Sequence, residues 1–487
     1  FVDMIMAKTI EKRKQVLEEI LKYSEEGIKN LELVFQDALI ADTYLFPVQT
    51  FSSMASDFAL NLSEKLLYSK RAIDIGKRGL TYALRSGAPE ASISTLHALS
   101  KAHYYHSTLE QKKEEKAESL KSALGFRKEY IKTAKDVFPS NLWILGVGLV
   151  YAAQIETDLS RLESDDKTKS SLLEEAISDM SEGVFNCKNW ITARAVTSTF
   201  ASLAEFEDTF GGILYEGFLL TSENENLSKA NSVYGDAAED FKKVDLPSRV
   251  AESYWKIARN LDFVGDFDLA ARNFENAFAS YKAAAQRISQ FSDFYLDYSS
   301  YMKAWSEIES AKKAHNDEKY EEAMIHYEKT SQLLRQSKSW MFLSLNFYAW
   351  SLLEQAEDLS RKEFSRESAE SFEKAVKFFN ESKRILNSKM DSIDRKDERD
   401  FVRRLISVSE FREEYSRGRI AIEEAKGLSK KGDYLASAEK YSKAASVFQK
   451  ISLVDSDATG REAKPMIYLC RAWEKMSLAE ARGSPIM

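Results

Sequence analysis

Two histidines and a glutamate are the residues of this chain best suited to metal chemistry. His103 and His106 are three residues apart, and Glu110 follows four residues later. On a helix these spacings place all three side chains on one face, and imidazole and carboxylate groups are common zinc ligands. An ordinary polar helix face beside Tyr104 and Tyr105 would have the same spacing, and we favour that interpretation. We therefore predict no metal site and no cofactor.

Other signatures of catalysis are absent from the sequence. It contains no phosphate loop of the form G-x-x-x-x-G-K-[ST], no G-x-S-x-G, no H-E-x-x-H and no C-x-x-C. Gly146 and Gly148 lie inside an apolar helical run rather than after a strand, which argues against a dinucleotide-binding turn. We predict no catalytic residues and expect that the chain is not an enzyme.

The composition is typical of a folded, helical protein. Of 487 residues, 44% are hydrophobic and 30% are charged, whereas only 6 are proline and 18 are glycine. A β-sandwich or barrel of this length needs many more turn residues. The net charge of −8 argues against a nucleic-acid partner.

The two cysteines and the longest apolar run indicate the cellular compartment in which the protein is expected. Cys187 and Cys470 lie far apart, which excludes a disulfide framework and favours a reducing, cytoplasmic setting. The longest apolar run, from Leu142 to Ile155, is shorter than the roughly 20 residues that span a bilayer. We expect this run to form a buried helix, without membrane insertion.

A repeated pattern of small and aromatic residues gives the architecture. A small residue, an aromatic, a second small residue and a second large apolar residue recur at offsets 0, +4, +7 and +11. The five copies begin at Ala230, Ala270, Ala323, Ser368 and Ser437. These offsets place four side chains on one helix face, where small residues admit a neighbouring helix and large ones fill the gaps.

Four of the copies follow a second helix and a short turn. The preceding helix carries an alanine twelve positions before the copy, at Ala258, Ala311, Ala356 or Ala425. Gly265-Asp266 and Gly432-Asp433 stand in two of the turns. Glycine can end a helix in the left-handed conformation, and aspartate can cap the helix that follows.

These helix pairs resemble the tetratricopeptide repeat family. In the best copy the matching residues are Ala258, Leu261, Gly265, Asp266, Phe267, Ala270, Phe274 and Ala277. The resemblance covers about 225–450 and implies an all-α fold, an α-solenoid of antiparallel helix hairpins stacked in a right-handed superhelix. The copies begin 40, 53, 45 and 69 residues apart, against about 34 in the family. Helices or loops longer than usual are therefore expected.

Polar and glycine-rich segments indicate where the chain divides. The segment 221–228 reads TSENENLS. We predict a boundary there, between an N-terminal helical region, residues 1–224, and the repeat array with its terminal capping helix, residues 225–487. Residues 190–220 are expected to form a helix pair that bends at Gly211 and Gly212.

In the family, the first helix of each pair lines a concave face that binds other proteins. Matching these positions gives seven candidate residues, to which we add the isolated His315. The candidates are Trp255, Arg259, Trp305, Lys312, His315, Trp350, Arg419 and Lys426. The basic members would suit an acidic peptide or a C-terminal carboxylate. Two other interpretations stay open: the tryptophans pack between helices, and the basic residues only solvate the surface.

The predicted function is a non-catalytic scaffold that binds a protein segment or peptide in this concave face. The alternative is the sensor or regulatory arm of a larger signalling or defence protein, with the enzymatic NTPase or effector domain outside this chain. The start at Phe1 rather than methionine, and a final helix around 465–481 with no later partner, favour that alternative.

Overall fold

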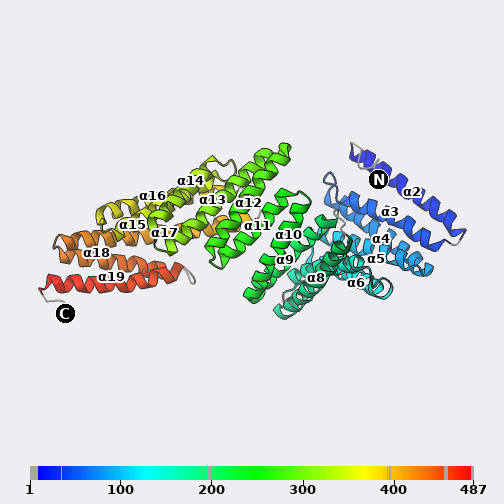
Figure 1. The fold of residues 1–487 in the computed structure, drawn as a ribbon, viewed down its shortest axis with the longest axis horizontal. Coiled ribbons are helices and arrows are strands. Elements are labelled where there is room, and N and C mark those ends of the chain that lie inside the picture. The colour runs from blue at the N-terminus through cyan, green and yellow to red at the C-terminus, as the bar shows by residue number, and fades with distance from the viewer. Residues whose placement is uncertain are drawn as a thin grey trace. The chain divides into compact units, whose positions relative to one another are not determined.

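The computed structural model describes residues 9–34, 36–194, 199–391, 393, 396–453 and 459–483. These ranges contain eighteen α-helices and two 3-10 helices, and they hold no β-strand (Figure 1). The predicted all-α fold is confirmed.

The helices form two compact units, Phe1–Asp245 and Leu246–Met487. Unit 1 is built from α2 (Ile10–Glu32), α3 (Asp37–Ala55), α4 (Leu62–Ser86), α5 (Pro89–Leu109), α6 (Lys113–Val137), α7 (Leu142–Leu162), α8 (Asp166–Arg194), α9 (Phe200–Thr221) and α10 (Asn224–Lys243). Unit 2 is built from α11 (Pro247–Phe263), α12 (Phe267–Arg287), η2 (Ser289–Phe291), α13 (Ser292–Asn316), α14 (Tyr320–Gln336), η3 (Met341–Leu343), α15 (Ser344–Arg361), α16 (Ser365–Met390), α17 (Lys396–Lys430), α18 (Tyr434–Ser452) and α19 (Thr459–Ala481).

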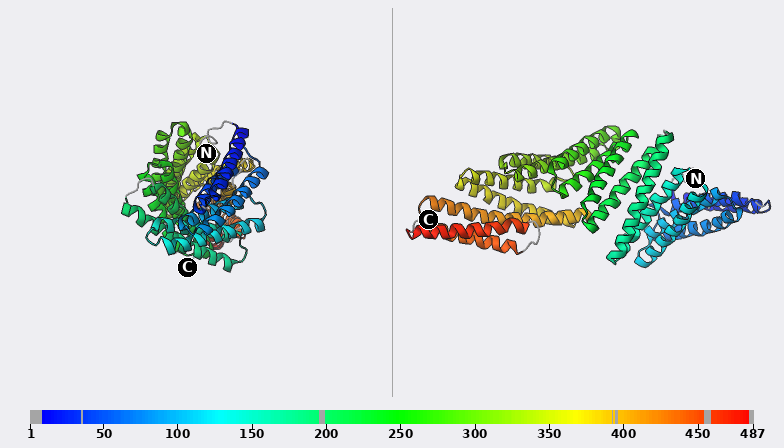
Figure 2. Two further views of the ribbon diagram at one scale, coloured as in Figure 1. Left: turned by 90° about the vertical axis from the view of Figure 1, so that its right-hand side faces the viewer. Right: turned by 60° about the horizontal axis from the view of Figure 1, so that its bottom comes forward.

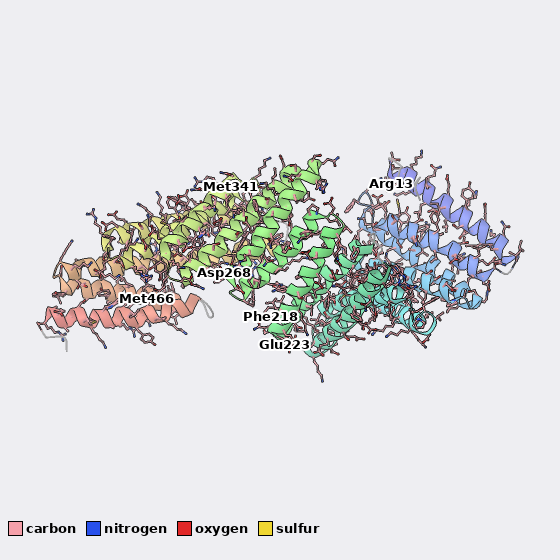
Figure 3. All side chains as sticks on the ribbon, viewed as in Figure 1. Arg13, Phe218, Glu223, Asp268, Met341 and Met466 are labelled. Atoms are coloured by element: carbon pink, nitrogen blue, oxygen red, sulfur yellow. The ribbon has the colours of Figure 1, made fainter. Side chains whose placement is uncertain are left out.

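Successive helices within each unit pack against one another as antiparallel pairs. In unit 2 the pairs are α11/α12, α13/α14, α15/α16 and α17/α18, and α19 packs on the last of them. Figure 2 shows α18 and α19 side by side, with α17 extending beyond both. Each pair therefore has a first helix and a second helix, which is the predicted solenoid of stacked hairpins.

The repeated pattern of small and large residues marks the second helix of five consecutive pairs. Its copies lie on α10, α12, α14, α16 and α18, and every anchor in them is buried. In α12, for example, Ala270, Phe274, Ala277 and Tyr281 are all nearly inaccessible to solvent. The prediction that these residues form the helix-packing face is confirmed.

The irregular spacing of the copies comes from the first helices. α11 has 17 residues, α13 has 25 and α17 has 35. At about 1.5 Å per residue, α17 is roughly twice as long as a helix of ordinary length in such a pair. The longest step along the sequence therefore contains one long helix rather than a long loop.

The predicted bend at Gly211 and Gly212 is wrong. Both glycines lie inside the continuous helix α9. A Cβ atom at position 211 would stand 2.5 Å from the ring of Tyr234 on α10. The glycine is needed because the two helices approach closely there, and not because the chain turns.

The predicted boundary at 224/225 falls at the start of α10, which packs against α9. The compact units instead divide after Asp245, between α10 and α11. A folding boundary at 224/225 stays a prediction.

The apolar run from Leu142 belongs to α7, and two glycines fix how that helix packs. Gly146 lies where an added Cβ would stand 2.5 Å from the Cys187 sulfur and 2.8 Å from the Gly183 carbonyl oxygen of α8. Among the described helices, α7 is the one whose length and composition would let it cross a membrane, and more than half of it is buried within the unit. The predicted burial is confirmed, although the helix is longer than the apolar run.

Each turn between a first and a second helix contains one residue in the left-handed conformation, which is a glycine in two turns and a glutamate in the other two. After α11 and α17 the left-handed position is held by Gly265, with φ of 81°, and Gly432, with φ of 83°. After α13 and α15 it is held by Glu318, with φ of 55°, and Glu363, with φ of 62°. A side chain in this conformation costs about 1–2 kcal/mol.

We expect Glu318→Gly to stabilise unit 2, because it removes this backbone strain and loses only an exposed ion pair with Arg361. The free energy of unfolding should rise by about 0.5–1 kcal/mol. Gly265→Ala is the matched control and should lower it by a similar amount. Urea unfolding followed by circular dichroism measures both, and a loss of stability in Glu318→Gly would contradict the explanation.

Candidate partner-binding site on the first helices of unit 2

All eight predicted binding residues lie on the first helices of unit 2. Trp255 and Arg259 come from α11, while Trp305, Lys312 and His315 come from α13. Trp350 comes from α15, and Arg419 and Lys426 come from α17. The structure thus brings the predicted residues onto consecutive helices, but it engages most of them in contacts within the unit.

The two middle first helices are largely covered. No residue from 297 to 315 on α13, and none from 342 to 360 on η3 and α15, is exposed, and all of them are described. The long helix α17 supplies part of this cover. Its Phe401 lies 5.8 Å from the ring of Trp305, and its Ser409 accepts a hydrogen bond of 2.6 Å from Asn346. A fully open concave face is therefore not present on these two helices.

The three tryptophans are packed rather than exposed. Trp305 is stacked on Phe274 of α12 with ring centroids 5.7 Å apart. Trp350 lies between Phe379 of α16 and the guanidinium of Arg412 on α17, which is 4.7 Å from the indole. Trp255 makes edge contacts with two tyrosines of α13. Of the interpretations left open above, packing between helices describes all three.

The charged candidates take part in a set of polar joints that connect each first helix to the next. We call the whole set the seam. Its members are Asp262, Glu309, Lys312, His315, Glu354, Glu357, Ser360, Arg419, Glu423 and Lys426. The seam has three joints, one for each step from α11 to α17.

The first joint connects α11 to α13. Lys312 Nζ lies 2.6 Å from Asp262 Oδ1 of α11 and 2.8 Å from Glu309 Oε1 of its own helix. Glu309 is fully buried. The lysine therefore neutralises two carboxylates and holds the two helices together.

The second joint connects α13 to α15 through a histidine. His315 Nδ1 lies 2.9 Å and 3.0 Å from the two carboxylate oxygens of Glu354. Glu354 is fully buried, and burial raises the pKa of its carboxyl group, although the bond from His315 opposes that rise. This joint consequently depends on a group that titrates more readily than lysine.

The third joint connects α15 to α17 and is the most extensive. Arg419 Nη1 lies 2.5 Å from Glu357 Oε2 of α15. Ser360 donates a hydrogen bond of 2.6 Å to the buried Glu423 of α17, whose carboxylate also receives Lys426 at 2.7 Å. Both basic candidates on α17 thus have carboxylate partners inside the unit.

The three joints share one geometry that the sequence already contains. The buried glutamate always stands two residues before the alanine that packs against the second helix, in Glu309-Ser-Ala, Glu354-Gln-Ala and Glu423-Glu-Ala. The group that reaches it from the previous helix stands four residues after the equivalent alanine. The sequence analysis did not identify these glutamates. The recurring motif glutamate-x-alanine is the signal that could have identified them.

Part of the seam remains accessible to a partner. The side chains of Lys312, His315 and Lys426 are 29%, 32% and 30% exposed. Arg259 on α11 is exposed. Burial raises the pKa of Glu309 to about 8 despite the nearby Lys312.

In unit 1 the histidine pair of α5 has an internal role. Glu110 Oε1 lies 2.9 Å from His106 Nε2, and Ser69 of α4 lies 2.7 Å from His106 Nδ1. His103 packs on Phe126, and burial lowers its pKa to about 4. Across the described ranges, no group of three or more histidine, cysteine, aspartate or glutamate side chains is arranged to hold a metal ion.

A buried carboxyl group in unit 1 also lacks adequate partners. Glu156 of α7 is fully buried, neither of its oxygens accepts a hydrogen bond, and Lys128 Nζ is 3.3 Å away. Burial, helped by Asp179 and Glu175, raises its pKa from 4.5 to about 7. This group is thus a source of pH-dependent stability.

We expect Arg419→Ala to be strongly destabilising, because it leaves the buried Glu357 carboxylate without its cation. The free energy of unfolding should fall by about 3–5 kcal/mol. Arg417→Ala is the control on the same helix, since that side chain is 46% exposed against 12% for Arg419. It should cost less than about 1 kcal/mol. Equal effects in chemical denaturation would show that the joint is not a stabilising element.

We expect the stability of unit 1 to fall as the pH rises from about 4.5 to 7. In that window the folded state keeps a proton on Glu156 that the unfolded state has released. Glu156→Gln should match the wild type near pH 5 and exceed it near pH 8 by up to about 3 kcal/mol. Urea titrations at the two pH values test this, and the exposed Glu129→Gln should leave the pH dependence unchanged. Parallel curves for Glu156→Gln and wild type would refute the assignment.

Neither a protein-family model nor a curated protein sequence matches this chain. Among solved structures, it is similar to BtubC (BKLC) from P. vanneervenii, with 16% identity over 57% of this chain and 91% of that one and a TM-score of 0.35. A circular tandem repeat protein is 14% identical over 91% and 97% of the two chains, with a TM-score of 0.25. A signal-transduction ATPase with a tetratricopeptide repeat sensor from Pyrococcus horikoshii is 13% identical over 83% and 55%, with a TM-score of 0.28. Likeness at this level says nothing about function, and the tetratricopeptide-like fold rests on the helix pairs described above.

Proposed function

We propose that this protein is a non-catalytic interaction scaffold that binds a protein segment along the seam of unit 2. The observation that carries the proposal is a set of partly exposed basic side chains on two of the first helices, Lys312 and His315 on α13 and Lys426 on α17, together with the exposed Arg259 on α11.

These cations are held in place before any partner arrives. The side chains of Lys312, His315 and Lys426 each contact a glutamate that is almost wholly removed from water. A lysine loses up to about 2 kcal/mol of side-chain entropy when it is ordered. Folding has already ordered these side chains, so no further side-chain entropy is lost when a partner binds. Each contact would therefore contribute more to the binding free energy.

The favoured partner is an anionic protein segment. The basic character of these side chains supports this choice, because they would attract the carboxylate groups of a partner. The packed tryptophans are not part of the proposed contact surface. We retain Arg259, Lys312, His315 and Lys426 as contact candidates and assign Trp305, Trp350 and Arg419 to the fold.

The sensor-arm alternative differs only in what the solenoid would be attached to. Such an arm would use the same seam to detect a partner. The test below therefore applies to both possibilities, and identifying the captured protein would separate them.

We expect a photo-crosslinking amino acid at position 259 to form covalent adducts with a partner in native extract. Placed at Arg272, on the second helix α12, the same group should not form them. Both positions are exposed arginines in one helix pair, so they differ only in the face that they occupy.

Charge reversal provides a second reading of the same site. Arg259→Glu should weaken capture of that partner by roughly tenfold, the effect of one charged contact, and Arg272→Glu should not. If the adducts formed from position 272, or if Arg259→Glu bound as well as wild type, the proposed surface would be incorrect.

A further inference from the structure

Unit 1 contains a buried arginine that no acid neutralises. Arg127 comes from α6 and is 0% exposed, which makes it the largest fully buried side chain in the described part of the chain. Its Nη1 lies 2.9 Å from His97 Nδ1, and its Nε lies 3.3 Å from the Ser100 hydroxyl, both on α5. Its guanidinium is 5.0 Å from the ring centres of Tyr130 and Tyr151.

The surroundings of Arg127 differ from those of the other buried cations described above. Arg419 and Lys312 each face two carboxylates. Among the residues that the structure describes, no carboxylate pairs with Arg127. Taking an ion out of water is costly, and two cation–π contacts recover only part of that cost. Burial lowers the pKa of Arg127 to about 10, so the side chain is still charged at neutral pH.

His97 extends the positive region toward the surface. Its Nδ1 accepts the hydrogen bond from Arg127, so in the neutral ring the proton is on Nε2 and can be donated elsewhere. The ring is only partly buried and makes an edge contact of 5.7 Å with Tyr151 of α7. Burial, then Arg127 and Lys101, lower the pKa of His97 to about 3. No acid contributes to that shift.

Lys101 completes the cluster on the outer side. It is exposed on α5, one turn after His97, and its ammonium lies 5.8 Å from the ring centre of Tyr151. Within the described ranges it has no carboxylate partner. Two cations, Arg127 and Lys101, and one neutral hydrogen-bond donor, His97, therefore lie around the ring of Tyr151, in a chain whose net charge is −8.

We propose that the face of α5 and α7 around His97, Lys101 and Tyr151 is a binding site for an oxyanion, the carboxylate or phosphate group of a ligand, with Arg127 as the buried charge beneath it. Lys101 Nζ and His97 Nε2 donate hydrogen bonds to the anion. Arg127 attracts it through the low-dielectric interior, where its charge is weakly screened. The site lies wholly in unit 1, so it does not depend on the function proposed for the seam.

The proposal explains why a cation is kept in this interior. A residue that served only to fill space between α5, α6 and α7 would not need a charge. An arginine that is incompletely compensated in the free protein gains its missing counter-ion when an anion binds. This pattern, in which a site is stabilised by its ligand and not by the fold alone, is typical of binding sites.

The test uses the imidazole resonances of the full chain, which has five histidines. The protein is labelled with ¹³C-histidine, and the His97 signal is assigned with His97→Gln. Sodium phosphate is titrated to tens of millimolar at constant ionic strength, and sodium succinate is titrated in parallel. We expect a saturable shift of the His97 signal with at least one of them, while the His326 signal does not move. The anion that acts at lower concentration identifies the source of the oxyanion.

Two variants and one control decide the outcome. Lys101→Ala should raise the concentration for half-saturation by roughly tenfold, the effect of one charged contact, and Arg127→Met should abolish the shift. Lys132→Ala, an exposed lysine on α6, should behave as wild type. No shift with either anion, or an unchanged shift in Lys101→Ala, would overturn the proposal. Since Lys101 is exposed, its substitution keeps the test valid even if Arg127→Met does not fold.

Discussion

The arrangement of unit 2 depends on one kind of contact, a carboxylate removed from water at each step between first helices. Glu309, Glu354 and Glu423 occupy equivalent places, and each contacts a basic side chain, Lys312, His315 or Lys426. A buried carboxylate tolerates few positions of its partner. The register between successive pairs is therefore fixed by polar contacts, while the small and aromatic residues of the second helices fix their spacing.

The sequence predicted the packing much better than it predicted the charges. The small and aromatic residues at Ala270, Phe274 and their equivalents identified every second helix from α10 to α18. Small and large residues recur there at regular spacings on one helix face, and such spacings can be recognised in a sequence. Among the charged residues of the first helices, only the buried glutamates recur in this way, and their basic partners do not. Lys312 or Arg419 has the same spacing whether it faces a ligand or a buried glutamate on the next helix. Whether such a side chain faces a ligand or a buried glutamate depends on which helix covers that side of the first helices. In unit 2 the helix α17 is long enough to cover it.

The two units manage buried charge in opposite ways. In unit 2 the interior cations Lys312 and Arg419 each have acidic partners, and only their partial exposure leaves something for a ligand. In unit 1 the acid and the base are separated: Glu156 has too little positive charge near it, and Arg127 has no carboxylate partner in the described part of the chain. Groups of that kind lower stability in the free protein. Binding of a proton to Glu156, or of an anion near Arg127, would accordingly have the largest effect on the stability of unit 1.

The contact between α17 and α13 has a consequence for how such an array can change over evolutionary time. In an ideal solenoid each repeat touches only its neighbours, so repeats can be gained or lost singly. Phe401 of the fourth pair packs on Trp305 of the second pair and passes over the third. Deleting the third pair would bring α17 onto the wrong partner, and inserting a pair would move it out of reach. Removing or inserting a single pair would therefore break the contact between Phe401 and Trp305.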